Sequence, residues 1–289
     1  MTRRQDEGPK TRRVLGPAVA GTWYPSSPAA LERDVDRLLV GAPADRPPIA
    51  LVVPHAGYVY SGAVAGQAFA RLAGRAFRRV ILIGPSHRAA FRGACLPAAE
   101  VYRTPLGDVA IDRDGIARLA GHPDFRVDDG PFVAEHCLEA EIPFLQRMLS
   151  GEWTLVPLLI GAGTEATRLE SVSFALRSLP AEGRLLVVSS DFTHYGPRFG
   201  YVPFESDLPR RIRELDMGAI DHIVRLDRAG FAAYVAETGA TICGRAAIEV
   251  LLGVLPAGVR AELVSYDTSA SMTGDWDHSV SYASLAFSP

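Results

Sequence analysis

Residues 49–58 (IALVVPHAGY) join a short apolar run to a histidine that stands between a proline and a glycine. Five consecutive apolar residues rich in valine and isoleucine are typical of a strand buried on both faces of a sheet. Two further stretches have the same form, residues 79–87 (RVILIGPSH) and residues 184–195 (RLLVVSSDFTHY). The three stretches predict neighbouring buried strands, each followed by a loop that carries a histidine.

The rest of the chain alternates between apolar runs and amphipathic stretches. We expect helices at 61–72, within 164–179, and at 210–226, 228–237 and 244–255, with further strands at 153–160, 260–266 and 280–287. Such alternation indicates an α/β fold with a mostly parallel or mixed central sheet covered by helices on both faces. No repeat divides the chain, so we predict a disordered polar tail at 1–13 and a single domain at 14–289.

The composition of the 289 residues is that of an ordinary globular protein. Hydrophobic residues make up 48% and charged residues 22%, and the formal net charge is −3. This balance gives no electrostatic footprint for nucleic acid, so we expect none among its partners. Of the 30 basic residues only Lys10 is a lysine, which we attribute to genome composition.

Two features bear on the compartment. The basic first residues are not followed by an apolar stretch, so we expect no signal peptide. The uncharged stretch 47–70 is interrupted by prolines and polar residues and is interpreted as loop, strand and buried helix, not as a membrane span. Three dispersed cysteines without a CxxC motif argue against a disulfide framework. We therefore expect a cytoplasmic protein without a membrane partner.

Three histidines follow predicted strands: His55, His87 and His194. In open α/β sheets, ligands bind just beyond the carboxyl ends of the strands. One such histidine alone is more often a hydrogen-bonded loop residue than a ligand. Three of them at one sheet edge, with glycine and proline beside them, favour a binding or metal site.

Cys243 stands at the predicted start of the helix 244–255. A helix N-terminus stabilises a thiolate, which is the form of cysteine that binds metal. The alternative is an inert buried cysteine, which is our interpretation of Cys95 and Cys137. Two histidines plus a thiolate or carboxylate would leave open positions on a metal, as catalytic sites do.

Residues 135–141 (EHCLEAE) form a second polar cluster. On a helix, His136 and Glu139 would be neighbours three residues apart, either as part of an ordinary charged helix start or as a carboxylate–histidine pair supporting the metal pocket. We expect Pro143 to kink that helix. Residues 161–166 fit a GxGxxG/A pattern, but the match is weak and lies in mid-chain, so we predict no dinucleotide site there.

At these positions the chain resembles the Memo family, whose prokaryotic members are named AmmeMemoRadiSam system protein B. Seven ordered motifs spanning about 260 residues carry the resemblance: AGTWYP (20–25), VVPHAGYVYSG (52–62), ILIGPSH (81–87), EHCLEAEIPFL (135–145), VSSDFTHYG (188–196), TICGR (241–245) and SVSYA (279–283). The family is similar in fold to the class III extradiol catechol dioxygenases, which are non-haem iron enzymes.

The resemblance implies a set of site residues. It makes His55, His87 and Cys243 the metal ligands, with Asp191 and His194 beside them and His194 as the acid–base residue. It also implies that five residues line or support the pocket, namely His136, Glu139, Trp23, Tyr58 and Tyr195. The sequence leaves the role of His278 open.

The cysteine departs from the carboxylate ligand of extradiol enzymes. We expect Fe(II), and the softer sulfur donor also suits copper or zinc. Three functions follow: a metal-dependent, dioxygenase-like oxidoreductase of unknown substrate, a non-catalytic metal- or peptide-binding protein, or a thiol- or metal-dependent hydrolase. The family name further implies an AMMECR1-type protein and a radical SAM enzyme as partners. Such an enzyme would carry its own cluster, since three dispersed cysteines cannot hold one.

Overall fold

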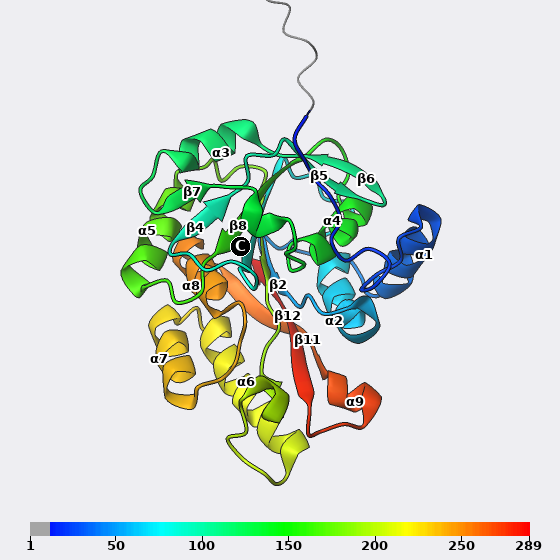
Figure 1. The fold of residues 1–289 in the computed structure, drawn as a ribbon, viewed down its shortest axis with the longest axis vertical. Helices are drawn as coiled ribbons and strands as arrows, with labels where there is room; N and C mark the ends of the chain where they lie inside the picture. The colour runs from blue at the N-terminus through cyan, green and yellow to red at the C-terminus, as the bar shows by residue number, and fades with distance from the viewer. Residues whose placement is uncertain (1–11) are drawn as a thin grey trace, which may run out of the picture.

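Four parallel strands form the centre of the structure, a computed structural model that describes residues 12–289 (Figure 1). Their order is β2 (Ala50–Val53), β9 (Arg184–Ser189), β3 (Arg79–Pro85) and β8 (Thr154–Ile160). Every residue of β2 is buried, as is every residue of β3 and β8 after the first. Continuous apolar runs fit this position because both faces of these strands are covered.

Antiparallel strands extend this centre into a mixed sheet. Strand β12 (Ser279–Ser288) pairs with β2, and both β11 (Arg260–Thr268) and β10 (His194–Tyr195) pair with β12. On the other side, β4 (Ala94–Leu96) pairs antiparallel with β8 and parallel with β7 (Phe125–Val127). A separate small sheet contains β1 (Val14–Leu15), β5 (Val101–Thr104) and β6 (Gly107–Ala110).

Helices cover both faces of the large sheet (Figure 1). Helix α2 (Tyr58–Ala70) packs on β2, β11 and β12, with α1 (Pro28–Leu38) and α4 (Ile142–Met148) against it. On the other face α8 (Arg245–Val254) packs on β3 and β9, and it contacts α5 (Ala166–Arg177) and α7 (Arg228–Thr238). Helix α6 (Leu208–Val224) lies against α7 and β11. The remaining helices are α3 (Arg113–Ala120) and α9 (Ser269–Thr273).

The predicted single-domain α/β architecture with a mixed central sheet is confirmed. The predicted tail at 1–13 lies almost wholly outside the described residues, and its boundary stays a prediction. None of the helices within 12–289 combines the length and the apolarity that crossing a bilayer requires.

The expected kink at Pro143 is wrong. The residues before it form a short 3-10 turn, Glu139–Glu141, and Pro143 lies in the first turn of α4. A proline is tolerated there because the first N–H groups of a helix have no intrahelical acceptor.

Candidate metal centre

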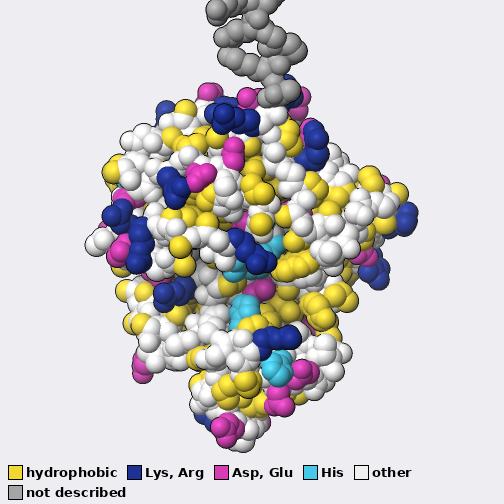
Figure 2. Space-filling view, viewed as in Figure 1, with side chains coloured by type: hydrophobic (Ala, Val, Ile, Leu, Met, Phe, Trp, Pro, Cys, Tyr) yellow, Lys and Arg dark blue, Asp and Glu magenta, His cyan; other side chains and the backbone are white. Residues whose placement is uncertain are grey.

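Three histidine side chains meet beyond the carboxyl ends of β2 and β3. The ring centroids of His55 and His87 are 5.3 Å apart, and the ring of His136 lies 5.4 Å from the first and 4.6 Å from the second. One ring nitrogen from each lies within 4.8 Å of those of the other two. Figure 2 shows histidine side chains in a hollow near the middle of this face. The cluster has the dimensions of a metal site.

His55 is the most buried member of the cluster. Its Nδ1 lies 2.7 Å from Ser189 Oγ, and its Nε2 lies 3.4 Å from Cys243 Sγ. Its backbone N–H donates to Asp191 at 2.9 Å. Burial, reinforced by the nearby charge of His87, holds the pKa of His55 well below its usual range. The imidazole is therefore neutral at pH 7, the form that binds metal.

His87 is oriented by a carboxylate. Its Nδ1 lies 2.8 Å from Glu135 Oε1, and its backbone N–H donates to Oε2 at 2.7 Å. Burial alone would raise the pKa of Glu135, but the hydrogen bonds and charge of His87 outweigh it and lower the pKa to about 2. An ionised partner at Nδ1 fixes the ring and leaves Nε2 for a metal. A carboxylate–histidine pair is present at the cluster, but it joins Glu135 to His87 and is not the expected pair of Glu139 and His136.

His136 and Glu139 do not form a pair, because the chain around His136 is not helical. The His136 ring packs against Trp23, with centroids 4.2 Å apart, at the histidine cluster. The fully buried Glu139 faces the other way. It accepts hydrogen bonds from the N–H of Val19 and the hydroxyl of Tyr24, and so holds the N-terminal segment that delivers Trp23.

The two predicted tyrosines lie outside the cluster. Tyr58 is buried, and its hydroxyl donates a hydrogen bond to the carbonyl of Ala140 at 2.7 Å. This contact supports the segment after His136. Tyr195 donates to the carbonyl of Phe204, and its ring stacks on the Phe204 ring with centroids 5.3 Å apart. Both hydroxyls donate to backbone carbonyl oxygens, so these side chains stabilise the surrounding backbone.

Cys243 lies just before α8, as expected, and its Sγ accepts the N–H of Asp191 at 3.2 Å. Gly244 permits this arrangement, because a Cβ there would lie 2.4 Å from the Cβ of Ser190. The expectation of a stabilised thiolate is wrong for the protein alone. Burial, and then the charge of Asp191, raises the pKa of the Cys243 thiol. Ionisation of this sulfur therefore requires a cation beside it.

One ring nitrogen of His194 faces backbone carbonyl oxygens. Its Nδ1 faces the carbonyl oxygens of Phe192 at 2.9 Å and Thr241 at 3.0 Å. Both are acceptors, so Nδ1 carries the proton of the neutral ring and Nε2 is its basic nitrogen. Sequence reasoning missed Asp216 of α6, which is buried and accepts the N–H of Thr193 at 3.1 Å. It fixes the loop between Asp191 and His194.

A cavity of about 410 Å³ adjoins the cluster and is lined by His87 and Cys243 together with Arg245, Glu249 and the loop 161–164. A second cavity, of about 300 Å³, contains Tyr60, Phe199 and His278. On the surface, the Nδ1 of His278 lies 3.5 Å from Asp275 Oδ2. His278 does not belong to the histidine cluster.

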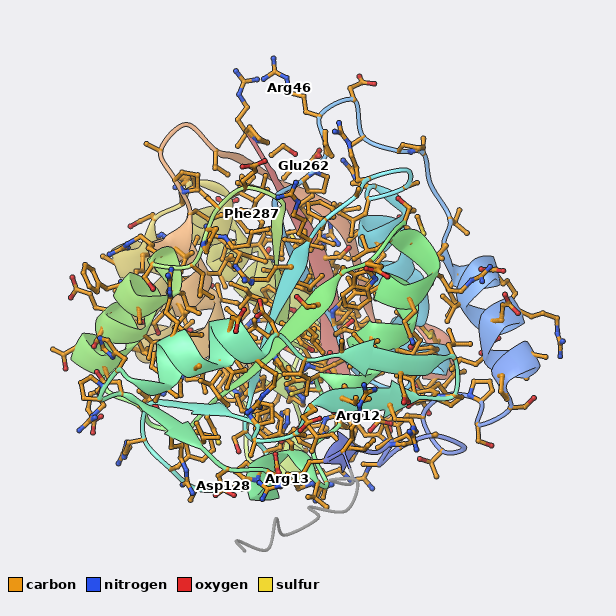
Figure 3. The ribbon with its side chains drawn as sticks, turned by 90° about the horizontal axis from the view of Figure 1, so that it is seen from above. Arg12, Arg13, Arg46, Asp128, Glu262 and Phe287 are labelled. Atoms are coloured by element: carbon orange, nitrogen blue, oxygen red, sulfur yellow. The ribbon has the colours of Figure 1, made fainter. Side chains whose placement is uncertain are left out.

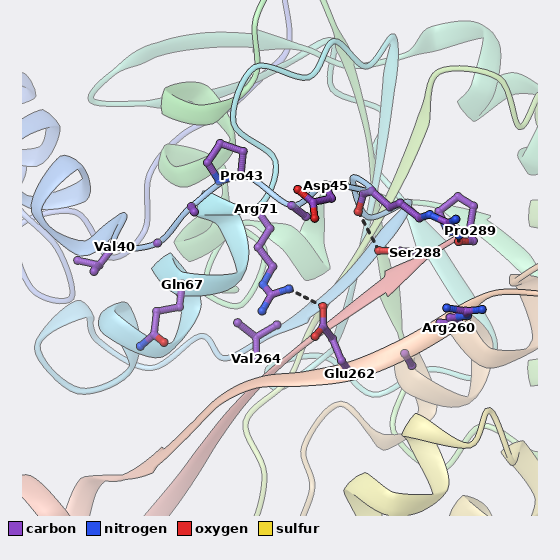
Figure 4. Close-up of a pocket in the computed structure, with 15 residues that line it drawn as sticks. Val40, Pro43, Asp45, Gln67, Arg71, Arg260, Glu262, Val264, Ser288 and Pro289 are labelled. Carbon is purple, nitrogen blue, oxygen red and sulfur yellow. Dashed lines mark hydrogen bonds and ion pairs between the residues drawn. The ribbon is translucent and has the colours of Figure 1, made fainter.

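A further cavity of about 810 Å³ lies at the opposite ends of the strands (Figure 4). Figure 3 shows two of its residues, Arg46 and Glu262, at the edge of the molecule far from Asp128. Its polar lining includes the ion pair between Arg71 and Glu262. The described residues bring no histidine or cysteine to it. The histidine cluster is therefore the candidate site.

The buried histidines predict a pH dependence of stability in the metal-free protein. Burial and the charges of His55 and His87 lower the pKa of His136 to about 3, from 6.5 in an unfolded chain. Because folding lowers the pKa of His136, the folded state has its full stability above pH 6.5, where this side chain is neutral in both states. Stability is lost as the pH falls from 6.5 toward 3, because the unfolded chain binds the proton more readily. Between pH 6.5 and 5 we expect His136 to lower the free energy of unfolding by about 2 kcal/mol. Urea unfolding measured at several pH values should show that the free energy of unfolding of His136→Gln falls less steeply with pH than that of the wild type. His278→Gln should match the wild type. The same pH dependence in all three proteins would contradict the assignment.

Comparisons with known proteins cover nearly the whole chain. The profile described as Memo-like protein matches residues 16–286. Protein MEMO1 of Homo sapiens is 32% identical over 281 residues, covering 92% of this chain and 95% of that protein. The MEMO1 family protein TV1383 of Thermoplasma volcanium is 34% identical over 275 residues, covering 94% and 97%. Among solved structures, the uncharacterized protein JW3007 from Escherichia coli K12 matches with a TM-score of 0.52 and 16% identity, over 82% of this chain and 98% of that one. At that identity the match concerns the fold alone.

Proposed function

The chain belongs to the Memo family, and from that premise we propose that it holds one metal ion and acts as a metal-dependent, dioxygenase-like oxidoreductase on a small molecule. The ligands we propose are His55, His87 and Cys243. Fe(II) is the metal that this function requires. One observation carries the proposal: histidine nitrogens converge within 4.8 Å of one another, with a cysteine sulfur 3.4 Å from the His55 Nε2.

The donor set fits such a metal. Two imidazoles and one thiolate suit Fe(II), zinc or copper, and three protein ligands leave coordination positions for other molecules. The second nitrogens of His55 and His87 are already engaged, by Ser189 and Glu135, so their rings are held with Nε2 available. His136 is a competing third ligand, since its ring nitrogen belongs to the same cluster.

The residues of the chain have distinct tasks in this mechanism. When bound, the metal supplies Lewis-acid polarisation of substrate oxygens and electrons for reaction with dioxygen. His194 takes a proton from the substrate at Nε2, because its Nδ1 is committed to two carbonyl oxygens. Asp191 holds the backbone of His55 and donates its own N–H to Cys243. The cavity beside His87 and Cys243 receives the substrate.

Metal analysis of anaerobically purified and reconstituted protein tests this proposal. We expect about one iron per chain, and oxygen uptake when catechol-type substrates are screened. His222→Ala is the control variant, since His222 pairs with Asp227 on the surface and should leave iron content unchanged. A protein that binds no iron, zinc or copper after reconstitution would overturn the metal centre.

A second candidate function is metal handling without turnover, which the sulfur donor Cys243 favours because thiolates prefer Cu(I) and zinc. Stoichiometric copper or zinc, with no oxygen uptake on any iron-loaded sample, would support this function and contradict the oxidoreductase.

A further inference from the structure

The hydroxyl of Ser189 contacts three groups at hydrogen-bonding distance. Its Oγ lies 2.7 Å from His55 Nδ1, 2.8 Å from Glu141 Oε1 and 2.7 Å from the carbonyl oxygen of Cys137. Ser189, Glu141 and Cys137 are fully buried, and His55 is 2% exposed. Water therefore does not share these contacts, and each one must contain a proton.

Counting donors and acceptors assigns the three protons. A serine hydroxyl has one hydrogen to donate and accepts at its two lone pairs. The carbonyl oxygen of Cys137 can only accept, so the Ser189 hydrogen points to it. The other two partners must then donate to Ser189, which places a hydrogen on His55 Nδ1 and another on Glu141 Oε1. An ionised Glu141 would instead set two bare oxygens 2.8 Å apart.

The second oxygen of Glu141 gives independent support. Its Oε2 is buried and has no hydrogen-bond partner among the described residues. A full negative charge there would be unpaired in a dry environment, whereas the carbonyl oxygen of a neutral acid is less costly to leave unpaired. Burial acts in the same direction and raises the pKa of Glu141 well above its usual range.

We propose that Glu141 is a carboxylic acid at neutral pH and that, through Ser189, it fixes His55 as the Nδ1–H tautomer. The lone pair of His55 then lies on Nε2, the nitrogen that faces Cys243. Glu141 and Ser189 are positioning residues: they act on His55 and touch no substrate. The value of this tautomer for metal binding rests on the proposed function, but the tautomer and the protonated acid belong to the metal-free protein.

The first test uses the metal-free protein at neutral pH. Long-range proton–nitrogen NMR correlations should show His55 as the Nδ1–H tautomer, and Ser189→Ala should shift it toward a mixture. Ser173→Ala is the matched control, since Ser173 is equally buried and bonds to the carbonyls of Leu169 and Val250. Infrared spectra should contain a protonated carboxyl band that disappears in Glu141→Gln. This variant keeps a donor toward Ser189, so it should retain the wild-type tautomer.

The second test measures zinc affinity by chelator competition. Ser189→Ala should bind zinc about 10- to 100-fold more weakly, as expected when the support of a ligand histidine is removed, and Ser173→Ala should stay within about 2-fold. The inference is overturned if the protonated carboxyl band persists in Glu141→Gln, or if the His55 tautomer is unchanged in Ser189→Ala. If the wild type binds none of zinc, iron and copper, the proposed function fails, and the two spectroscopic results still decide this inference.

Discussion

Replacing His55 with alanine is expected to abolish stoichiometric metal binding, weakening affinity by more than about 100-fold. His55 is 2% exposed, its Nε2 faces Cys243, and its Nδ1 is held by Ser189, so its removal takes away a ligand atom that the surrounding side chains already orient. Cys243→Ala should have the same effect, because it removes the donor expected to carry negative charge. The measurement is metal content after anaerobic reconstitution and gel filtration, together with a competition titration.

Two variants make this result specific to the ligand set. His194→Ala should keep its metal, because His194 is assigned to proton transfer and not to the metal. His136→Ala should also keep it, despite the proximity of the His136 ring to His87. If His136→Ala loses the metal while Cys243→Ala retains it, the ligands are three histidines and the cysteine assignment is wrong.

Replacing Phe144 with alanine is expected to lower the free energy of unfolding by about 3–5 kcal/mol. Phe144 is 1% exposed, stacks on Phe69 with ring centroids 5.1 Å apart, and lies 4.9 Å from the ring of Tyr58. The cavity left behind sits between α2 and α4, where neighbouring rings cannot close it without leaving their own contacts. We expect a melting temperature lower by roughly 10 °C.

Phe174→Ala is the matched control for this change. Phe174 is the same residue type on α5, but it is 65% exposed. Its replacement should cost less than about 0.5 kcal/mol in chemical denaturation. Equal losses for the two variants would show that the region around Phe144 does not have the packing described above.

The central strands could be predicted from the sequence because burial on both faces demands apolar runs. Such a run can be identified without knowing which strand it pairs with. The run 79–83 corresponds to β3, which extends to Pro85, and the run 184–190 corresponds to β9. The strands β4 to β7 were not predicted. They contain three or four residues each, several of them polar, and their pairing depends on contacts with distant strands, not on local periodicity.

The candidate site could be predicted in part for a topological reason. Parallel strands end at one edge, so histidines that follow β2 and β3 meet there whatever the loops do. The partners of those histidines could not be predicted, because they depend on the course of irregular backbone. Glu135 reaches His87 from a non-helical segment, and Ser189 is simply the last residue of β9. The assumption of a helix at 135–141 pointed to Glu139 as the partner of His136, but Glu139 instead anchors the N-terminal segment.

The spread of the ligand atoms along the chain has a consequence for folding. The contact between His55 and Cys243 joins residues 188 positions apart, and Glu139 reaches back 120 positions to Val19. The chain loses conformational entropy when loops of this length close, before the contacts they bring together can stabilise it. These contacts therefore form late. No fragment shorter than residues 55–243 contains the complete set of proposed ligands. Metal capture should therefore be a late event of folding, and bound metal should report that residues 55–243 have come together.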